Sequence, residues 1–251
     1  MPEDELVISF KSTVVYKRDK DLLQPGFWLN DILISFWLEI LEHVPDIALG
    51  MHIPLLAPRQ TYLVQPTTVS LYNYLEPLDL CESLRSLKLN EFDRILFPIS
   101  DADIDSSNPH GSHWTLLLFD RLSVKLYHFD SARNISNDRN LKVATNFIKA
   151  LWPLLCEENK SREQGLLPVT PPKIEEGICG QQTNGSDCGP HVLLCIERVI
   201  IKELSLTDSI SKEKYKSFIE SFRDLSEGTT PMDAHEFRIR YNRVLETFKP
   251  I

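Results

Sequence analysis

The stretch from Gln181 to Cys195 places one cysteine where a thiol could act as a nucleophile. A polar, turn-forming run ends at Cys188, and an apolar segment begins directly after it. Ser186 and Asp187 are common helix N-cap residues and Pro190 is tolerated in a first turn, so the pattern predicts a helix that starts near Cys188. The N–H groups and dipole of a helix N-terminus stabilise a thiolate. The alternative is inert packing, which is the usual role of a buried cysteine.

A thiol hydrolase also needs a general base, a group that orients this base, and donors for the oxyanion. His113 opens an expected strand after a polar loop, and Asp130 closes the next strand. If these strands are neighbours, the two side chains could face the same end of a sheet. Gln182 lies shortly before Cys188, where its amide could donate to an oxyanion beside the Cys188 N–H. This set predicts a Cys/His/Asp hydrolase.

Each of these side chains also has an ordinary interpretation. His113 could be a structural histidine, Asp130 a turn residue and Gln182 a polar loop residue. Other histidines compete for the role of base, and periodicity does not separate them: His110, His128 and His191.

Cysteine usage indicates the compartment. The five cysteines form no CxxC pair and are odd in number: Cys81, Cys156, Cys179, Cys188 and Cys195. Reduced thiols inside the cell are therefore expected rather than disulfides, and we expect a cytoplasmic or nuclear location. A metal site from Cys179, Cys188 and His191 is an alternative, but the spacing matches no standard zinc motif, so we expect no metal.

Composition excludes several classes of protein. The 251 residues are 42% hydrophobic and 25% charged, which is ordinary for a globular protein. The net charge of -9 argues against a nucleic-acid partner, which would favour a basic stripe. The first residues lack the order of a signal peptide, and no run approaches the roughly 20 apolar residues of a membrane span. We therefore expect neither a nucleic-acid nor a membrane partner.

The elements that must position the reactive residues show both helical and strand periods. We expect a strand within 6–16, helices over 28–41 and 68–75, strands over 94–99, 113–119 and 124–129, a helix over 138–155, a loop over 156–180 with one short strand, the helix at Cys188, and helices over 211–225 and 233–248. This order predicts an α+β fold with a central mixed β-sheet flanked by helices. No internal boundary stands out, so residues 1–251 are expected to form a single domain, in which 226–251 could be a helical extension.

The motifs together resemble the ubiquitin-like-protein cysteine proteases, a family that includes the SUMO proteases and the deneddylases. The resemblance rests on Gly111-Ser112-His113-Trp114, Asp130-Ser131, Gln182-x5-Cys188-Gly189 and the box Trp28-Leu29-Asn30-Asp31. The order His, Asp, Gln, Cys differs from the papain order, so the resemblance implies a papain-like catalytic core that is circularly reordered. The phrases Tyr74 to Leu80 and Tyr127 to Ser131 are most similar to the deneddylase branch. The resemblance runs from about residue 6 to residue 225.

The resemblance implies a role for each motif residue. His113 would be the general base, Asp130 its orienting acid, Cys188 the nucleophile and Gln182 the oxyanion donor. Trp28 and Trp114 would line a narrow tunnel around a Gly-Gly tail, because two glycines pass where side chains would clash and indole faces pack on bare backbone. Asn30 and Asp31 would contact the tail before the glycines. Core packing is the alternative for Trp28 and Trp114, and it is the expected role of Trp37 and Trp152.

The function that the resemblance implies is cleavage after the Gly-Gly of a ubiquitin-like modifier. We expect a monomeric isopeptidase that removes the cullin-modifying ubiquitin-like protein from conjugates such as cullins. The same enzyme could also process the precursor of this modifier. We expect no cofactor. The alternatives are a protease for SUMO or ubiquitin, a non-catalytic adaptor that holds a modifier tail, and an acetyltransferase. The chain departs from many relatives at Pro190-His191, which follow the Asp-Cys-Gly motif and add a titratable group near the thiol.

Overall fold

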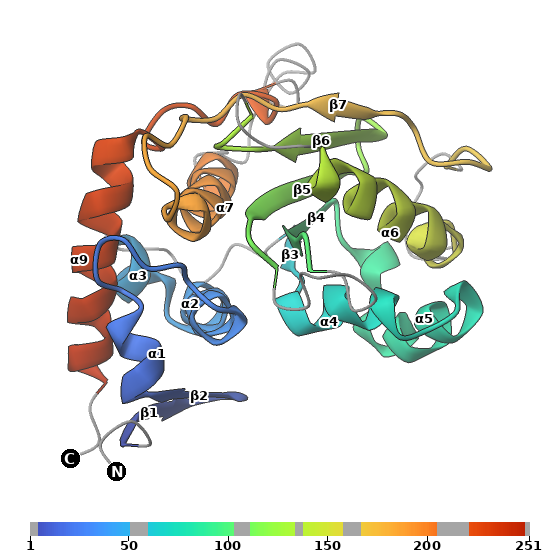
Figure 1. Cartoon of the computed structure of the whole chain (residues 1–251). Helices are drawn as coiled ribbons and strands as arrows, with labels where there is room; N and C mark the ends of the chain where they lie inside the picture. Colours follow the sequence, from blue (N-terminus) through green and yellow to red (C-terminus); the bar gives the residue numbers. More distant parts are fainter. Residues whose placement is uncertain are drawn as a thin grey trace. The chain divides into compact units, whose positions relative to one another are not determined.

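The computed structural model describes residues 5–50, 60–102, 111–133, 138–157, 167–204 and 221–248 (Figure 1). Contacts between Cα atoms divide the chain into two compact units. Unit 1 comprises Met1–Pro58, Asp130–Asn134 and Ile178–Ile251, and unit 2 comprises Arg59–Phe129 and Ile135–Gly177. Each unit therefore combines segments that are far apart in the sequence. No helix in the described ranges is long and apolar enough to cross a membrane.

Unit 2 is built on a five-stranded sheet, and the predicted mixed character of the sheet is confirmed. The strand order is β3 (Thr61–Leu63), β4 (Arg94–Ser100), β5 (Trp114–Asp120), β6 (Lys125–Phe129) and β7 (Ile174–Glu176). The two outer pairs are parallel, and β5 is antiparallel to both of its neighbours. The three middle strands are buried along nearly their whole length, which agrees with their near-continuous apolar sequence.

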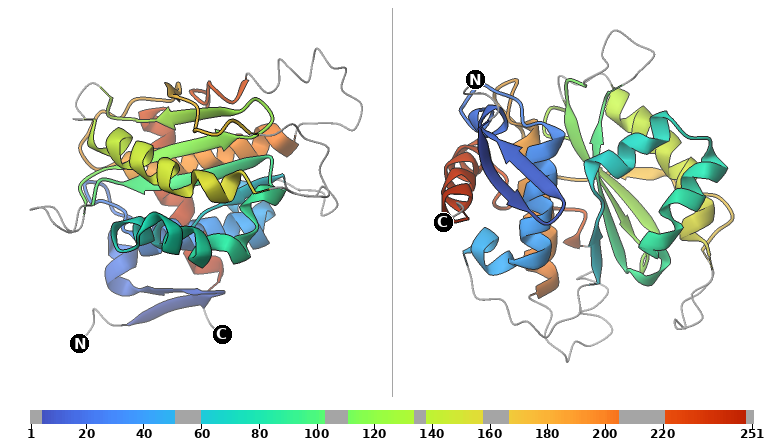
Figure 2. Two further views of the ribbon diagram at one scale, coloured as in Figure 1. Left: turned by 90° about the vertical axis from the view of Figure 1, so that its right-hand side faces the viewer. Right: turned by 90° about the horizontal axis from the view of Figure 1, so that it is seen from below.

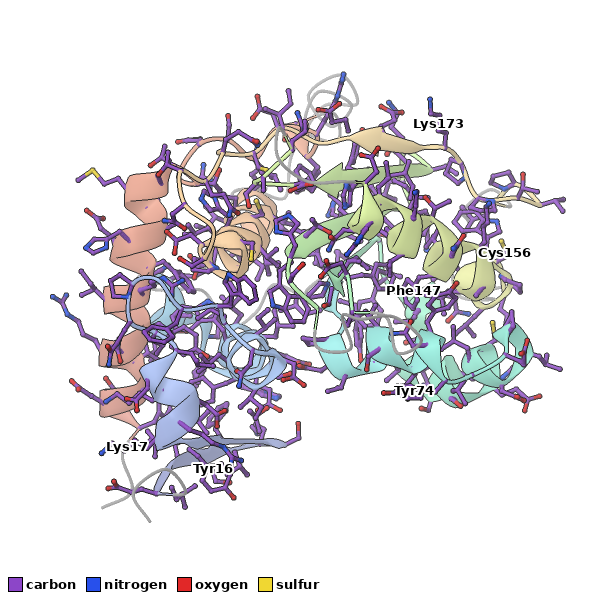
Figure 3. The ribbon with its side chains drawn as sticks, viewed as in Figure 1. Tyr16, Lys17, Tyr74, Phe147, Cys156 and Lys173 are labelled. Carbon is purple, nitrogen blue, oxygen red and sulfur yellow. The ribbon has the colours of Figure 1, made fainter. Side chains whose placement is uncertain are left out.

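Helices of unit 2 complete its core. They are α4 (Pro66–Ser70), α5 (Pro77–Leu84) and α6 (Arg139–Leu155). In the left view of Figure 2, α6 runs in front of the strands of the sheet. Phe147, labelled in Figure 3, meets Phe97 of β4 edge to face with ring centroids 5.3 Å apart. Trp152 meets Phe119 in the same way at 5.4 Å and is buried, so its predicted place in the core is confirmed.

Unit 1 is mainly helical. Its elements are the hairpin β1 (Leu6–Phe10) and β2 (Thr13–Tyr16), followed by α1 (Lys17–Asp21), α2 (Asp31–His43), α3 (Pro45–Leu49), α7 (Cys188–Leu204) and α9 (Pro231–Thr247). Trp37 of α2 is fully buried against α9, with its ring 4.5 Å from that of Tyr241 and 4.9 Å from that of Phe237. Trp37 is therefore a core residue, as predicted.

A buried carboxylate links the three long helices of unit 1. Glu197 of α7 accepts from Trp37 Nε1 at 2.8 Å and from Arg240 of α9 at 2.6 Å. Burial raises the pKa of Glu197, and the Arg240 guanidinium and the Trp37 hydrogen bond act in the opposite direction. Since a buried charge is costly without partners, these contacts hold α2, α7 and α9 in one arrangement.

Several short elements differ from the prediction. Segment 6–16 forms two strands, because Lys11 adopts a left-handed conformation (φ 50°) and turns the chain. The helix expected over 68–75 is α4 followed by a 3-10 turn at Leu71–Asn73. Helix α5 is not among the predicted elements; its Pro77 lies in the first helical turn, where proline is tolerated. Strand β7 is the short strand predicted within 156–180, and most of the expected helix 211–225 lies outside the described residues.

His191 is the most unusual polar residue of the unit 1 core. It lies in the first turn of α7 with 1% of its surface exposed, and neither ring nitrogen forms a well-shaped hydrogen bond within the described part of the chain. Burial lowers the pKa of His191 to about 4, against the opposing influence of the Asp187 carboxylate and the Thr229 backbone. The ring is therefore neutral in the folded protein at pH 7.

We predict that this histidine makes the protein lose stability in mild acid. Below about pH 6.5 the unfolded chain binds a proton that folded His191 does not bind until about pH 4, so folding weakens across this window by up to about 3 kcal/mol. Urea unfolding of the wild type and of His191→Leu at a series of pH values measures the effect, and the variant should show the flatter profile. The exposed His235 supplies the control His235→Leu, which should keep the wild-type slope. Parallel profiles for wild type and His191→Leu would refute the prediction.

Candidate active site

Cys188 is the first residue of α7, as its sequence context predicted. The Asp187 carbonyl accepts the first helical hydrogen bond from the His191 N–H at 3.0 Å, so Asp187 occupies the N-cap position. Its carboxylate accepts hydrogen bonds from Asn184 Nδ2 at 2.6 Å and from Arg238 Nε at 2.9 Å. The residue before the candidate nucleophile is therefore held by side chains from the preceding loop and from α9.

The loop before Cys188 is folded around one amide side chain. Asn184 Oδ1 accepts from the N–H groups of Ser186 at 2.9 Å and Asp187 at 3.0 Å, and from the Ser186 hydroxyl at 3.1 Å. Gly189, on the other side of the cysteine, approaches the Trp28–Asp31 box so closely that an added Cβ would lie 2.9 Å from Leu29 Cβ. The glycine after the cysteine is thus required by packing.

The Trp28–Asp31 box lies against the cysteine loop within unit 1. Trp28 Nε1 donates to the Gly185 carbonyl at 2.5 Å, and half of the Trp28 surface is exposed. Asn30 is the N-cap of α2, because its Oδ1 accepts from Leu33 N at 3.0 Å, while its Nδ2 donates to Asp19 at 2.8 Å. Asp31 is exposed at the first position of α2. The side chain of Asn30 is therefore used to hold this segment in place.

Gln182 and the segment after β6 are joined by hydrogen bonds in both directions. Ser131 Oγ donates to Gln182 Oε1 at 2.8 Å, and the Gln182 N–H donates to the Ser131 carbonyl at 2.7 Å. Gln182 Nε2 donates to the Asn184 carbonyl at 2.6 Å. Asp130 is buried, and its Oδ1 accepts from the Ala132 N–H at 2.8 Å. Because Ser131 occupies the amide oxygen, the nitrogen of Gln182 faces the cysteine loop.

His113 and Trp114 belong to unit 2, where buried side chains fix the backbone. The His113 N–H donates to Asp101 Oδ1 at 2.8 Å, and its carbonyl accepts from Asn140 Nδ2 at 3.0 Å. Gly111 has a φ of 72°, and an added Cβ would lie 2.3 Å from Ser100 Oγ, so only glycine fits this turn. Both His113 and Trp114 are half-buried.

The structure brings six of the eight predicted site residues together in unit 1: Trp28, Asn30, Asp31, Asp130, Gln182 and Cys188. The expectation that β5 and β6 are neighbours is confirmed, with Leu116 opposite Phe129 in an antiparallel pair. The start of β5, which follows His113, and the end of β6, which precedes Asp130, therefore lie at the same edge of the sheet.

The competing histidines differ from His113 in their surroundings. His128 lies within β6, where its buried Nε2 is 2.9 Å from Thr115 Oγ1. His191 is enclosed in the core of unit 1. His110 lies outside the described residues. Of the histidines in the predicted set, His113 alone adjoins the edge of the sheet among those that the structure describes.

Other cysteines are poor candidates for a thiolate. Burial raises the pKa of the Cys81 and Cys156 thiols, and a hydrogen bond with Cys179 together with burial raises the pKa of Cys195 well above its usual value. A raised pKa reduces the fraction of the reactive thiolate at neutral pH. Within the described ranges, no three His, Cys, Asp or Glu side chains gather in a way that could hold a metal ion.

Sequence reasoning missed residues that hold the site together: Ser131, Asn184 and Arg238. The Asn184-Gly185 pair is a recognisable turn signal, so the folded loop could have been found. No local pattern connects Ser131 with Gln182 or Arg238 with Asp187, because these contacts join distant parts of the chain.

Comparison with known proteins identifies the family. Residues 80–227 match the model of the Ulp1 protease family, C-terminal catalytic domain. The chain is 29% identical over 213 residues to the probable sentrin-specific protease 8 of Dictyostelium discoideum, covering 80% of this chain and 78% of that protein. It is 27% identical over 205 residues to NEDD8-specific protease 1 of Arabidopsis thaliana, covering 81% and 78%.

Solved structures show the same fold. The C-terminal Ulp1 protease domain in complex with Smt3, the yeast ortholog of SUMO, aligns with a TM-score of 0.54 at 18% identity, covering 96% of this chain and 90% of that one. The Xanthomonas campestris effector XopD bound to ubiquitin aligns with a TM-score of 0.56 at 18% identity, covering 89% and 98%. The resemblance found in the sequence motifs is thereby confirmed. The chain belongs to the Ulp1 protease family and is a cysteine protease that acts on ubiquitin-like proteins.

Proposed function

We propose that the chain is a deneddylase, an isopeptidase that cleaves after the C-terminal Gly-Gly of the cullin-modifying ubiquitin-like protein. The observation that carries this proposal is Cys188 at the first position of α7, with the Gln182 amide held beside its loop. The substrate follows from the relatives, several of which are named NEDD8-specific proteases. Its conjugates would include cullins, and the enzyme would act as a monomer in the cytoplasm or nucleus without a metal or organic cofactor.

In the proposed mechanism, His113 takes the proton of the Cys188 thiol and Asp130 orients the imidazole. The thiolate attacks the carbonyl carbon of the terminal glycine, and the resulting oxyanion accepts from the Cys188 N–H and from Gln182 Nε2. Collapse of this intermediate breaks the amide bond, and the imidazolium gives its proton to the leaving lysine amine. Water deprotonated by His113 then hydrolyses the thioester, which releases the modifier and restores the thiol.

The hydrogen bonds of Gln182 support its proposed role. An amide group carries two N–H bonds, so the bond to the Asn184 carbonyl leaves a second one for the oxyanion. The Ser131 hydroxyl on the amide oxygen disfavours the flipped orientation, which would present an acceptor to the oxyanion. A donor that is oriented before the substrate arrives needs no rearrangement during the reaction.

Trp28 and Trp114 would each contact the tail of the modifier. The hydrogen bond to Gly185 holds the Trp28 indole while half of the side chain stays exposed. Asp31 is exposed at the N-terminus of α2, where it could pair with a basic residue ahead of the two glycines. The Asn30 amide is bonded to Leu33 and Asp19, so Asn30 would hold this segment in place beside the tail.

The substrate proposal predicts selective labelling. Probes that carry a C-terminal electrophile on the cullin modifier, SUMO or ubiquitin are incubated with the protein, and the adducts are read by intact mass. We expect the cullin-modifier probe to label Cys188 fastest. Preference for SUMO or ubiquitin would keep the mechanism and refute the substrate, and the absence of any adduct would refute the protease function.

The nucleophile prediction concerns Cys188→Ala. Removing the thiol should lower kcat about a million-fold, to the level of residual transition-state binding, and leave the affinity for the modifier unchanged. Hydrolysis of a modifier–lysine substrate and calorimetric binding measure the two quantities. Cys156→Ala is the matched control, because Cys156 follows α6 in unit 2, and this variant should keep full turnover (Figure 3). Turnover by Cys188→Ala at the wild-type rate would exclude this residue as the nucleophile.

Asp130→Asn tests the orienting acid. Asparagine keeps an oxygen that accepts from the Ala132 N–H, so the variant should fold, while the loss of the carboxylate should lower kcat by up to about 10⁴-fold. Turnover and thermal unfolding are measured together, with the exposed Asp46→Asn as the control. A folded Asp130→Asn with normal kcat would contradict the assigned role.

A further inference from the structure

Arg238 of α9 is buried, with 3% of its surface exposed. Its guanidinium donates to one carboxylate and to backbone carbonyls of two separate segments. The acceptors are Asp187 Oδ1 at 2.9 Å from Nε, the carbonyls of Leu22 at 3.0 Å and Gln24 at 3.3 Å from Nη1, and the carbonyls of Phe27 at 2.8 Å and Ser186 at 2.9 Å from Nη2. These bonds engage all three nitrogens of the side chain.

The two segments that Arg238 joins are those that lead into the proposed site. The carbonyls over 22–27 precede Trp28, and Ser186 and Asp187 precede Cys188. One guanidinium therefore fixes the separation between the segment before Trp28 and the segment before Cys188. The hydrogen bond from Trp28 to Gly185 ties the same two segments a second time. Only arginine offers a rigid planar array of donors that fits such a set of acceptors.

The contact with Asp187 acts directly on the start of α7. The Asp187 carbonyl accepts the first hydrogen bond of the helix, and its carboxylate lies between Arg238 and Asn184. While Arg238 and Asn184 hold the carboxylate, they also restrict the Asp187 backbone and so the peptide that joins Asp187 to Cys188. This peptide carries the Cys188 N–H, which is one of the proposed oxyanion donors.

Helix α9 presents Arg238 from a rigid position. Phe237 and Tyr241, on either side of it in the sequence, pack on Trp37, and the Tyr241 hydroxyl donates to the Leu33 carbonyl. At the other end, Thr230 and Asp233 form a capping box. The helix lies beyond residues 80–227, the part of the chain that matches the family model, so the match does not assign it a role.

We propose that Arg238 is a positioning residue of the reaction, acting from α9 through Asp187 and the segment before Trp28. The proposal rests on the proposed function, because it takes Cys188 as the nucleophile and Trp28 as part of the tail site. The hydrogen-bond acceptors of Arg238 are the Asp187 carboxylate and backbone carbonyls, so Arg238 acts through these groups. It holds the first turn of α7 and the Trp28 segment at the separation that a Gly-Gly tail requires.

Arg240 provides a matched control. It lies on the same helix and is also bonded within unit 1, to Glu197 at 2.6 Å and to the Ala48 carbonyl at 2.7 Å. Its partners belong to α7 beyond the first turn and to α3, not to the segments before Trp28 and Cys188. A general effect of losing a hydrogen-bonded guanidinium of α9 should therefore appear in both Arg238→Lys and Arg240→Lys, whereas an effect on positioning should appear only in the first.

The test compares Arg238→Lys and Arg240→Lys with wild type on a modifier–lysine substrate, with rates normalised to the folded fraction. For Arg238→Lys we expect kcat/KM to fall about 10- to 100-fold, with contributions from both KM and kcat, because a small displacement of reacting groups has this effect. Arg240→Lys should keep wild-type values. Equal kinetics for Arg238→Lys and wild type would overturn the proposal, and so would equal losses in the two variants.

A second readout does not depend on the substrate. The rate of Cys188 alkylation by iodoacetamide is followed by peptide mass between about pH 5 and pH 9, the range in which activated thiols titrate. We expect Arg238→Lys to shift the midpoint or lower the plateau of this profile and Arg240→Lys to match wild type. If no modifier is cleaved by wild type, the proposed function fails, while this profile still decides the role of Arg238.

A further variant addresses loss of folding. If Arg238→Lys unfolds, the double variant Asp187→Asn with Arg238→Met removes the buried charges together, and an uncompensated charge is the main cost of breaking such a pair. We expect the double variant to be folded and to show the same loss of kcat/KM, about 10- to 100-fold. A folded double variant with wild-type kinetics and alkylation would overturn the proposal.

Discussion

The buried carboxylate of Asp187 constrains the whole of unit 1 around the candidate nucleophile. It has 7% of its surface exposed, and a charge in such a place is stable only with close partners. Asn184 supplies one partner from the loop and Arg238 supplies the other from α9. Pairing this charge therefore requires the loop to fold and α9 to dock. The same guanidinium binds the segment before Trp28, so local order at Cys188 depends on three separate segments of unit 1.

Unit 2 uses the same physical device for the proposed base. Asp101 is buried, and its carboxylate accepts from the Ser112 and His113 N–H groups and from the Ser112 hydroxyl. A carboxylate that receives backbone N–H groups fixes the course of the chain more firmly than packing does, because the hydrogen bonds are directional and charge-assisted. Cys188 and His113 thus lie at the ends of secondary structure, each beside a carboxylate that has no proposed catalytic role.

Features with local causes could be predicted from the sequence. The helix start at Cys188 follows from cap residues and Pro190, and the neighbouring strands β5 and β6 follow from two apolar runs with a tight connection between them. Strand β3 was not predicted, because this three-residue segment is defined by its parallel pairing with β4, which lies much farther along the chain. The roles of Arg238 and Ser131 could not be predicted either, because they arise from pairing across long sequence separations. Pattern reasoning therefore identified candidates for the reacting groups and missed the groups that hold them in place.

The link between stability and activity in unit 1 follows from where its polar groups lie. Asp187 and Arg238 are buried and bonded to each other, so the pair contributes both to folding and to the geometry at the start of α7, whereas Glu197 is bonded to Arg240 farther along the helix. His191 is the exception, since it is buried in the first turn of α7 with no well-formed partner in the described chain. An apolar residue there would satisfy packing without this cost. A histidine one turn after the candidate nucleophile therefore lowers the stability of unit 1, because the cost of dehydrating its ring is not recovered by a well-formed hydrogen bond within the described residues.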